Sequence, residues 1–169
     1  MQYRDKFRSR LNKLKSENRY RTYVELERHV GRHPFATWQS PNGPKDVVIW
    51  CSNDYLGMGQ HPAVIDAMQS AVIHTGSGAG GTRNISGTST GIVELEKALA
   101  SLHQKSRALV LTSGYVANEA SISALAGLLN NVVIFSDEMN HASIISGIRT
   151  ARCEKVIFRH NDCAHLETL

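Results

Sequence analysis

The sequence lacks any long apolar run. No stretch of its 169 residues approaches the roughly 18 apolar residues of a membrane-spanning helix, and the opening decapeptide MQYRDKFRSR has no apolar centre of the kind found in secretory signals. We therefore expect a protein that stays in the cytoplasm, where it is made, and that has no membrane contact.

Cysteine is scarce as well. The three cysteines, Cys51, Cys153 and Cys163, form no C-x-x-C pair, which is the spacing typical of structural zinc sites and of dithiol redox centres. An odd number of cysteines without such spacing favours a reducing compartment. The sequence therefore predicts no metal site.

Aromatic residues make up only 7% of the chain, and no repeat of solenoid period is present. The net charge of +4 is unevenly spread, because residues 1–33 contain ten Lys or Arg and four Asp or Glu, a net +6, which leaves −2 for residues 34–169. Without aromatics interleaved for base stacking, this basic segment does not predict a nucleic-acid partner. It indicates a solvated helix face or a surface that attracts an anionic substrate.

The first part of the chain contains signals for one helix and one strand. The spacing of Phe7, Leu11 and Leu14 predicts an amphipathic helix that docks on a larger body. A polar connection is expected at 40–46, followed by a short strand within 47–54. This part of the chain therefore predicts an arm that leads into a larger folded region.

A G-x-G-x-x-G pattern at Gly76, Gly78 and Gly81 has the spacing of a dinucleotide-binding turn. Such a turn needs a strand before it and a helix after it, because the phosphates bind where the strand passes into the helix. Here residues 61–76 predict a helix that starts near Pro62 and ends at the first glycine. The sequence therefore predicts no dinucleotide site.

From residue 106 onwards, strand and helix patterns alternate three times. The strands are expected at 107–111, 132–135 and 155–158, and the helices at 117–129, 142–151 and 164–169. Such βαβ units place parallel strands in one sheet with helices on both faces. The predicted fold class is therefore α/β, with a helical arm and connection over 1–46 and a mostly parallel sheet within 47–169.

Polar residues follow each of these strands, at the edge of the sheet where ligands of α/β proteins bind. Thr112 and Ser113 precede the amides of Gly114 and Tyr115 at a predicted helix start, where free N–H groups and the helix dipole favour an anion such as phosphate. The alternative is a plain helix cap in which Ser113 only satisfies an amide. The residues leave both interpretations open.

His141 follows the strand at 132–135 and lies close in sequence to Ser136 and Asp137. An imidazole there can lie against an aromatic ring or transfer a proton. His160 and Asp162 indicate a structural turn pair and not a catalytic dyad. No G-x-S-x-G elbow is present.

Six segments resemble a known enzyme family. These are RYRTY (19–23), VIWCSNDYLGMGQHP (48–62), GSGAGGTRNISGTS (76–89), LTSGYVANEA (111–120), SDEMNHASII (136–145) and IFRHNDCAHL (157–166). Together they are similar to 5-aminolevulinate synthases, which belong to the α-oxoamine synthase group of pyridoxal-phosphate (PLP) enzymes. NDYLG and the glycine cluster are shared across that whole group. GTRNISGT together with YRT is more specific and is typical of the 5-aminolevulinate synthases within it.

The resemblance implies a fold and a reaction. Members have the aspartate aminotransferase-like fold, known as fold type I, so residues 47–169 would be the first part of a PLP-binding large domain. The family condenses glycine with succinyl-CoA to give 5-aminolevulinate, CoA and CO2, the first step of tetrapyrrole and heme biosynthesis. The cofactor supplies the electron sink and the protein supplies position and electrostatics.

The resemblance also implies roles for individual residues. Gly114 and Tyr115 would contact the phosphate and ring region of PLP, and His141 would stack over its ring. Arg21 would pair with the succinyl carboxylate, because a planar guanidinium can bind two oxygens at once. Arg83 is expected to form a structural ion pair or to hold a backbone carbonyl.

Further residues would contact the substrates. Ser136 and Lys155 would bind succinyl-CoA, and Asn53, Thr82 and Asn84 would line the substrate pocket. Members of the family are homodimers with shared active sites, so some of these residues would reach in from a partner subunit. The glycines at 76–81 would then allow close backbone approach at that interface.

One departure separates this chain from the family pattern. Members have about 400 residues, and the resemblance implies that the Schiff-base lysine and the aspartate that holds the pyridinium nitrogen lie beyond residue 169. We therefore expect an N-terminal piece of a synthase, with doubtful activity on its own. The alternatives are another α-oxoamine synthase that uses a different acyl-CoA, or a catalytically silent fragment that only associates with intact subunits.

Overall fold

The structure, a computed structural model, describes residues 3–169. It consists of two compact units, the first ending at Gly78 and the second extending from Ala79 to Leu169. The division between 1–46 and 47–169 stays a prediction.

The first unit begins with α1 (Tyr3–Ser16). The helix predicted from the spacing of Phe7, Leu11 and Leu14 is therefore confirmed. No residue of α1 is buried, and its basic last turn places Lys13 3.8 Å from Glu17. The helix presents a solvated face, and its docking on a larger body stays a prediction.

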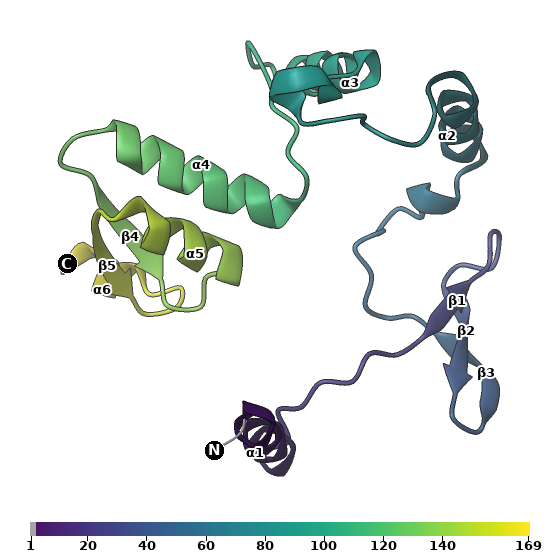
Figure 1. Ribbon diagram of the computed structural model, residues 1–169. Helices are drawn as coiled ribbons and strands as arrows, with labels where there is room; N and C mark the ends of the chain where they lie inside the picture. Colours follow the sequence, from purple (N-terminus) through teal and green to yellow (C-terminus); the bar gives the residue numbers. More distant parts are fainter. Residues whose placement is uncertain (1–2) are drawn as a thin grey trace. The chain divides into compact units, whose positions relative to one another are not determined.

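A three-stranded antiparallel sheet follows, formed by β1 (Leu26–Arg28), β2 (Phe35–Ser40) and β3 (Gly43–Val48) in that order (Figure 1). The prediction of a polar connection at 40–46 is wrong, because these residues form the β2–β3 hairpin, in which Ser40 Oγ donates to the carbonyl of Gly43. Pairing with β2 ends at Val48, so the strand predicted within 47–54 is correct only at its start.

The residues after β3 turn instead of continuing as a strand. Ser52 Oγ accepts from the amide of Asp54 at 3.1 Å, and the Asp54 carboxylate accepts from the amide of Gly59 at 3.1 Å. These side chains offer the backbone an alternative to strand pairing, which is the usual effect of Ser and Asp in loops.

The predicted helix at 61–76 is confirmed as α2 (Pro62–Thr75). Gly76 ends it with a φ of 77°, in the left-handed range that favours glycine, and donates its amide to the carbonyl of Val72. A helix therefore leads into the glycine cluster, as predicted, and no strand does.

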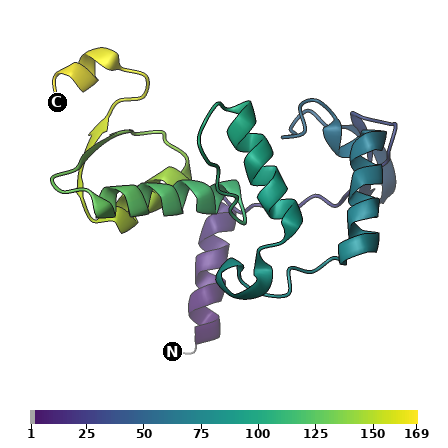
Figure 2. The same ribbon diagram turned by 90° about the horizontal axis from the view of Figure 1, so that it is seen from above.

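The second unit contains a π-helical turn (Arg83–Gly87), α3 (Thr90–Leu102), α4 (Gly114–Leu128), β4 (Val133–Asp137), α5 (Ala142–Ala151), β5 (Glu154–Phe158) and α6 (Cys163–Glu167). β4 and β5 pair in parallel, with Ser136 opposite Ile157, so the predicted βαβ unit is confirmed. In the two views α4 lies alongside α5 (Figures 1 and 2).

The strand predicted at 107–111 is wrong, because within residues 3–169 this segment pairs with no other strand. Val110 is held by side chains instead. Its amide donates to Glu96 Oε1 at 2.8 Å, and its carbonyl accepts from Arg83 Nη1 at 3.0 Å. An extended segment needs a neighbouring strand to form a ladder, and the described residues provide two side chains in its place.

Small residues form the close contact between α4 and α5. A Cβ added at Gly147 would lie 3.0 Å from Ile122 Cβ and 3.1 Å from the carbonyl oxygen of Glu119. Ala126 and Ile148 are buried nearby. The two helices are therefore fixed tightly against each other, and the residues at their N-terminal ends are fixed with them.

Within 3–169 no helix is both long and apolar enough to cross a membrane. The same residues contain no group of three or more His, Cys, Asp or Glu side chains that could hold a metal ion.

Candidate functional site

The N-terminal end of α4 offers open hydrogen-bond donors. Ser113 Oγ accepts from the amide of Val116 at 3.2 Å, so the predicted cap is present. The amides of Gly114 and Tyr115 are in the first turn, where no intrahelical acceptor exists, and they have no other partner in the described chain. A Cβ at Gly114 would meet nothing within 4 Å. This helix end therefore has both donors and room for an anion.

His141 lies next to this helix end. Its ring centroid is 6.2 Å from that of Tyr115, with the ring planes at 72° in an edge-on arrangement. His141 is also the N-cap of α5, where Nδ1 accepts from the amide of Ser143 at 3.2 Å. The segments that precede α4 and α5 thus bring Tyr115 and His141 together. Of these two segments only the second directly follows a strand of the described sheet, β4.

Two residues that were missed from the sequence support His141. Asn118 on α4 donates through Nδ2 to Ser143 Oγ at 3.0 Å, and Ser143 Oγ lies 2.7 Å from His141 Nδ1. The Ser143 side chain is completely buried. One signal was available in the sequence, since both residues are polar at positions where the helices would otherwise carry apolar contacts.

Asp137 ties the loop after β4 to the loop after β5. Its carboxylate accepts from the amides of Met139 at 2.8 Å and Asn161 at 3.0 Å, and it contacts His160 Nδ1 at 2.9 Å. The pKa of Asp137 is lowered, first by the Asn161 amide and then by the Met139 amide. His160 is therefore structural, as predicted, but the carboxylate it contacts is Asp137.

Arg83 and Glu96 form the shortest ion pair among the described residues of the second unit. Arg83 Nη1 and Nη2 donate to the two carboxylate oxygens at 2.6 and 3.1 Å, and the same guanidinium holds the carbonyl of Val110. The hydrogen bond from Arg83, followed by that from the Val110 amide, lowers the pKa of Glu96 to about 2. The expected structural role of Arg83 is confirmed in both forms, as an ion pair and as a carbonyl clamp.

The glycine cluster forms a tight loop before α3. The carbonyl of Thr82 accepts from three amides of the turn, and a Cβ at Gly87 would overlap the carbonyl oxygen of Gly81. Thr82 and Asn84 are exposed on this turn. Close backbone approach therefore occurs within the loop, whereas an approach to a partner subunit stays a prediction.

The two residues assigned to succinyl-CoA differ in exposure. Lys155 is exposed on β5. Ser136 is only 2% exposed, and its hydroxyl accepts from Asn140 Nδ2 at 2.9 Å. Contact with a substrate stays a prediction for both.

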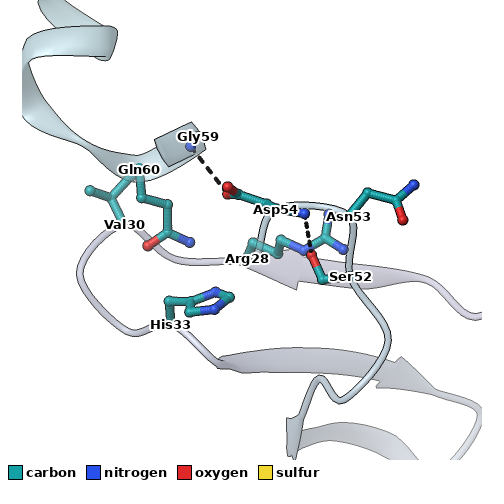
Figure 3. Close-up of a pocket in the computed structure, with 8 residues that line it drawn as sticks. All are labelled: Arg28, Val30, His33, Ser52, Asn53, Asp54, Gly59 and Gln60. Carbon is teal, nitrogen blue, oxygen red and sulfur yellow. Dashed lines mark hydrogen bonds between the residues drawn. The ribbon is translucent and has the colours of Figure 1, made fainter. Parts of the chain in front are cut away.

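Asn53 lies in the first unit, at the edge of a cavity of about 550 Å³. Figure 3 shows Arg28 reaching toward the turn at Ser52–Asp54, with His33 and Gln60 further along the cavity. The Arg28 side chain makes no hydrogen bond or ion pair within the described residues, whereas its backbone belongs to the β1–β2 ladder opposite Ala36. Arg21 is exposed in the extended segment between α1 and β1 and does not line this cavity. Sequence reasoning missed Arg28.

Residues 45–169 match the family model of aminotransferases class I and II. The chain belongs to this family. The predicted fold class is thereby confirmed, and the parallel β4–α5–β5 unit is the part of it that the described residues contain.

Relatives with known names are similar over the whole chain. 5-Aminolevulinate synthase of Bradyrhizobium diazoefficiens is 56% identical over all 169 residues, which correspond to 41% of that protein. The enzyme of the same name from Rhizobium meliloti is 51% identical over 99% of the chain and 41% of its own length. The resemblance inferred from the six segments is therefore confirmed, and the chain spans about two fifths of the length of these curated relatives.

Solved structures agree with this assignment. Serine palmitoyltransferase from S. paucimobilis, with bound PLP and myriocin, matches with a TM-score of 0.80 and 31% identity, over 97% of this chain and 41% of that one. Sphingomonas wittichii serine palmitoyltransferase matches with a TM-score of 0.79 and 31% identity, over 96% of this chain and 39% of that one.

Proposed function

We propose that this chain contributes the first part of a 5-aminolevulinate synthase, which condenses glycine with succinyl-CoA. The main observation behind the proposal is that the rings of Tyr115 and His141 lie close together beside the open amides at the start of α4. High identity to two named synthases over nearly the entire chain supports the same function.

The residues at this site fit pyridoxal phosphate. The amides of Gly114 and Tyr115 would hold the phosphate oxygens, since both donors are open and no atom lies within 4 Å of a Cβ at Gly114. The ring of His141 would cover the cofactor ring, held in orientation by its contact with Ser143. PLP, when bound, supplies an electron sink for a carbanion formed next to an amino group.

The substrate groups are assigned to the remaining residues. Arg21 would pair with the carboxylate of the succinyl group, and Thr82, Asn84, Ser136 and Lys155 would contact the substrates. Asn53 would act from the cavity of the first unit. We add Arg28 to this set, because it lines the same cavity and lacks an internal partner within residues 3–169.

A homodimer with shared active sites is part of the proposal. α2 buries no residue, and its apolar side chains Val64, Met68, Val72 and Ile73 are exposed. An apolar helix surface of this kind is typical of a face that another chain, or another part of the same chain, covers. A cytoplasmic location likewise stays a prediction.

A chimera tests the function directly. Residues 1–169 are joined to the part of the Bradyrhizobium synthase that lies beyond the matched region, and formation of 5-aminolevulinate from glycine and succinyl-CoA is measured. We expect activity comparable to that of the parent synthase, and Arg21→Leu in the chimera raises KM for succinyl-CoA far more than KM for glycine. An inactive chimera beside an active parent contradicts the proposal.

The second candidate function is that of an α-oxoamine synthase with a different acyl donor. The similarity to solved serine palmitoyltransferases supports this alternative. A chimera that prefers a long-chain acyl-CoA over succinyl-CoA would favour it. A silent fragment that only associates with intact subunits is the third alternative, and it predicts that residues 1–169 co-purify with an intact synthase but form no product by themselves.

A further inference from the structure

Two contacts reach one nitrogen of His141, and a third holds the residue that makes them. Nδ1 accepts from the backbone amide of Ser143 at 3.2 Å, and it lies 2.7 Å from Ser143 Oγ. Ser143 Oγ also accepts from Asn118 Nδ2 at 3.0 Å. A chain of hydrogen bonds thus connects α4 to the histidine through a serine that solvent does not reach.

The direction of these bonds follows from the groups that make them. A backbone N–H only donates, so Nδ1 must carry a lone pair, and the proton of the neutral ring is then on Nε2. The Asn118 amide nitrogen also only donates, so it uses a lone pair of Ser143 Oγ and leaves the Ser143 hydroxyl proton for Nδ1. All three contacts therefore agree on one tautomer.

We propose that Ser143, held by Asn118, is a positioning residue that fixes His141 in the Nε2–H tautomer and in its orientation against Tyr115. The ring then has a single donor, Nε2–H, and its other nitrogen is occupied within the protein. The significance for catalysis rests on the proposed function, because a cofactor ring that stacks on His141 needs an imidazole with fixed plane and proton position.

Of the two contacts to His141 Nδ1, the one from the Ser143 hydroxyl is shorter, so we expect the hydroxyl to be the main determinant of the tautomer. In Ser143→Ala the backbone amide still donates to Nδ1, but the 2.7 Å contact is lost. Removal of one hydrogen bond of this kind is expected to lower the Nε2–H to Nδ1–H ratio about tenfold. The substitution removes one oxygen and keeps the volume nearly unchanged, so the fold is retained.

Ring nitrogen NMR tests the proposal. Spectra of the chain with ¹⁵N-labelled histidine are recorded at about pH 8.5, where imidazole is neutral. We expect His141 to be purely Nε2–H, and Ser143→Ala to populate Nδ1–H and to weaken the nuclear Overhauser effect between the His141 and Tyr115 rings. Asn118→Ala, which leaves Ser143 in place, gives a smaller change in the same direction.

Ser146→Ala is the matched control. Ser146 is on the same helix and also bonds to α4, through Glu119 Oε1 at 2.8 Å, but it does not contact His141. It is expected to leave the His141 spectrum unchanged. An Nδ1–H ring in the unsubstituted chain, or equal spectra for Ser143→Ala and the unsubstituted chain, or equal changes for Ser143→Ala and Ser146→Ala, would each overturn the proposal.

These spectra need neither cofactor nor substrate. A chimera that makes no 5-aminolevulinate would therefore contradict the proposed function without affecting the result on the His141 tautomer. The opposite outcome, an active chimera with a mixed tautomer, removes the positioning role of Ser143 alone.

Discussion

The two units hold their polar groups in different ways. In the second unit, Glu96, Asp137 and Ser143 each bind two or more partners from separate segments, so the loops before α4 and after β4 are fixed by the protein itself. In the first unit, side-chain hydrogen bonds are mostly local or exposed, and Arg28 faces a cavity without a partner in the described chain.

This difference separates a preorganised site from an adaptable one. Fixed donors and rings favour a resident group such as a cofactor, because no reorganisation is needed when it binds. An unpaired guanidinium in an open cavity favours an anionic group that arrives and leaves. We therefore propose that the cofactor binds to the second unit and an acid group of the substrate to the first.

The largest expected effect is on the packing that fixes the second unit. Gly147→Val introduces a side chain where even a Cβ would lie 3.0 Å from Ile122 Cβ, and this overpacking is expected to destabilise the unit by about 1–3 kcal/mol. Urea unfolding followed by far-UV circular dichroism measures it.

Gly127→Val is the matched control, because a Cβ at Gly127 in α4 would meet nothing within 4 Å. Its effect is expected to stay within about 0.5 kcal/mol. Equal destabilisation by the two substitutions would mean that α4 and α5 are not in tight contact at Gly147.

As the pH is lowered, the second unit is expected to lose stability at a higher pH than the β2–β3 hairpin of the first unit. The pKa of Glu96 is lowered to about 2 by Arg83 and the Val110 amide, and the pKa values of Asp137 and Asp162 are lowered chiefly by backbone amides. A carboxylate whose pKa falls on folding stabilises the fold fully above its unfolded pKa, near 4, and less as pH falls through its folded pKa.

Hydrogen exchange at the amides of Val110 and Asn161 measures this loss. Both amides donate to the carboxylates concerned, so their protection is expected to fall as the pH drops from about 4 to about 2. Loss of protection in the β2–β3 hairpin at a higher pH than at Val110 would contradict the comparison.

The smallest effect on stability, but a clear effect on binding, is expected at Arg28. Arg28→Gln should weaken binding of succinate about tenfold, since a charged hydrogen bond is lost, while stability changes by less than about 0.5 kcal/mol. Titration of the amide signals of residues 52–54 with succinate measures the affinity.

Arg32→Gln serves as the control for Arg28. Arg32 has an internal partner, Asp46 at 3.2 Å, in a pair whose side chains are half exposed or more. Its replacement is expected to leave succinate affinity unchanged. The same affinity in both variants would exclude Arg28 from anion binding.

The sequence predicts helix ends well in both units, because the signals are local. Ser113, Pro62 and Gly76 mark helix ends through their own backbone chemistry, and the run ASIISGIRTA matches α5 from its first to its last residue. The proximity of Tyr115 and His141 is expected from the sheet edge, but within residues 3–169 only His141 directly follows a strand, β4, and no strand leads into Tyr115.

Contacts distant in sequence explain the errors. The segment at 107–111 has strand composition, but its pairing depends on a neighbour, and Val110 is held by Glu96 and Arg83. Pro41 and Asn42 suit a polar connection as well as a tight turn, so the composition of 40–46 does not by itself predict the hairpin that pairing with β2 forms. No periodicity reports that Asn118 and Ser143, 25 residues apart, lie within hydrogen-bond distance.

A single titration tests the central claim most directly. Pyridoxal phosphate is added to the ¹⁵N-labelled chain, and amide shifts are mapped on the structure. The account predicts that the largest shifts occur at Gly114, Tyr115 and Val116 and at His141. Shifts concentrated around Arg28 and Asn53, with those four amides unmoved, would contradict it.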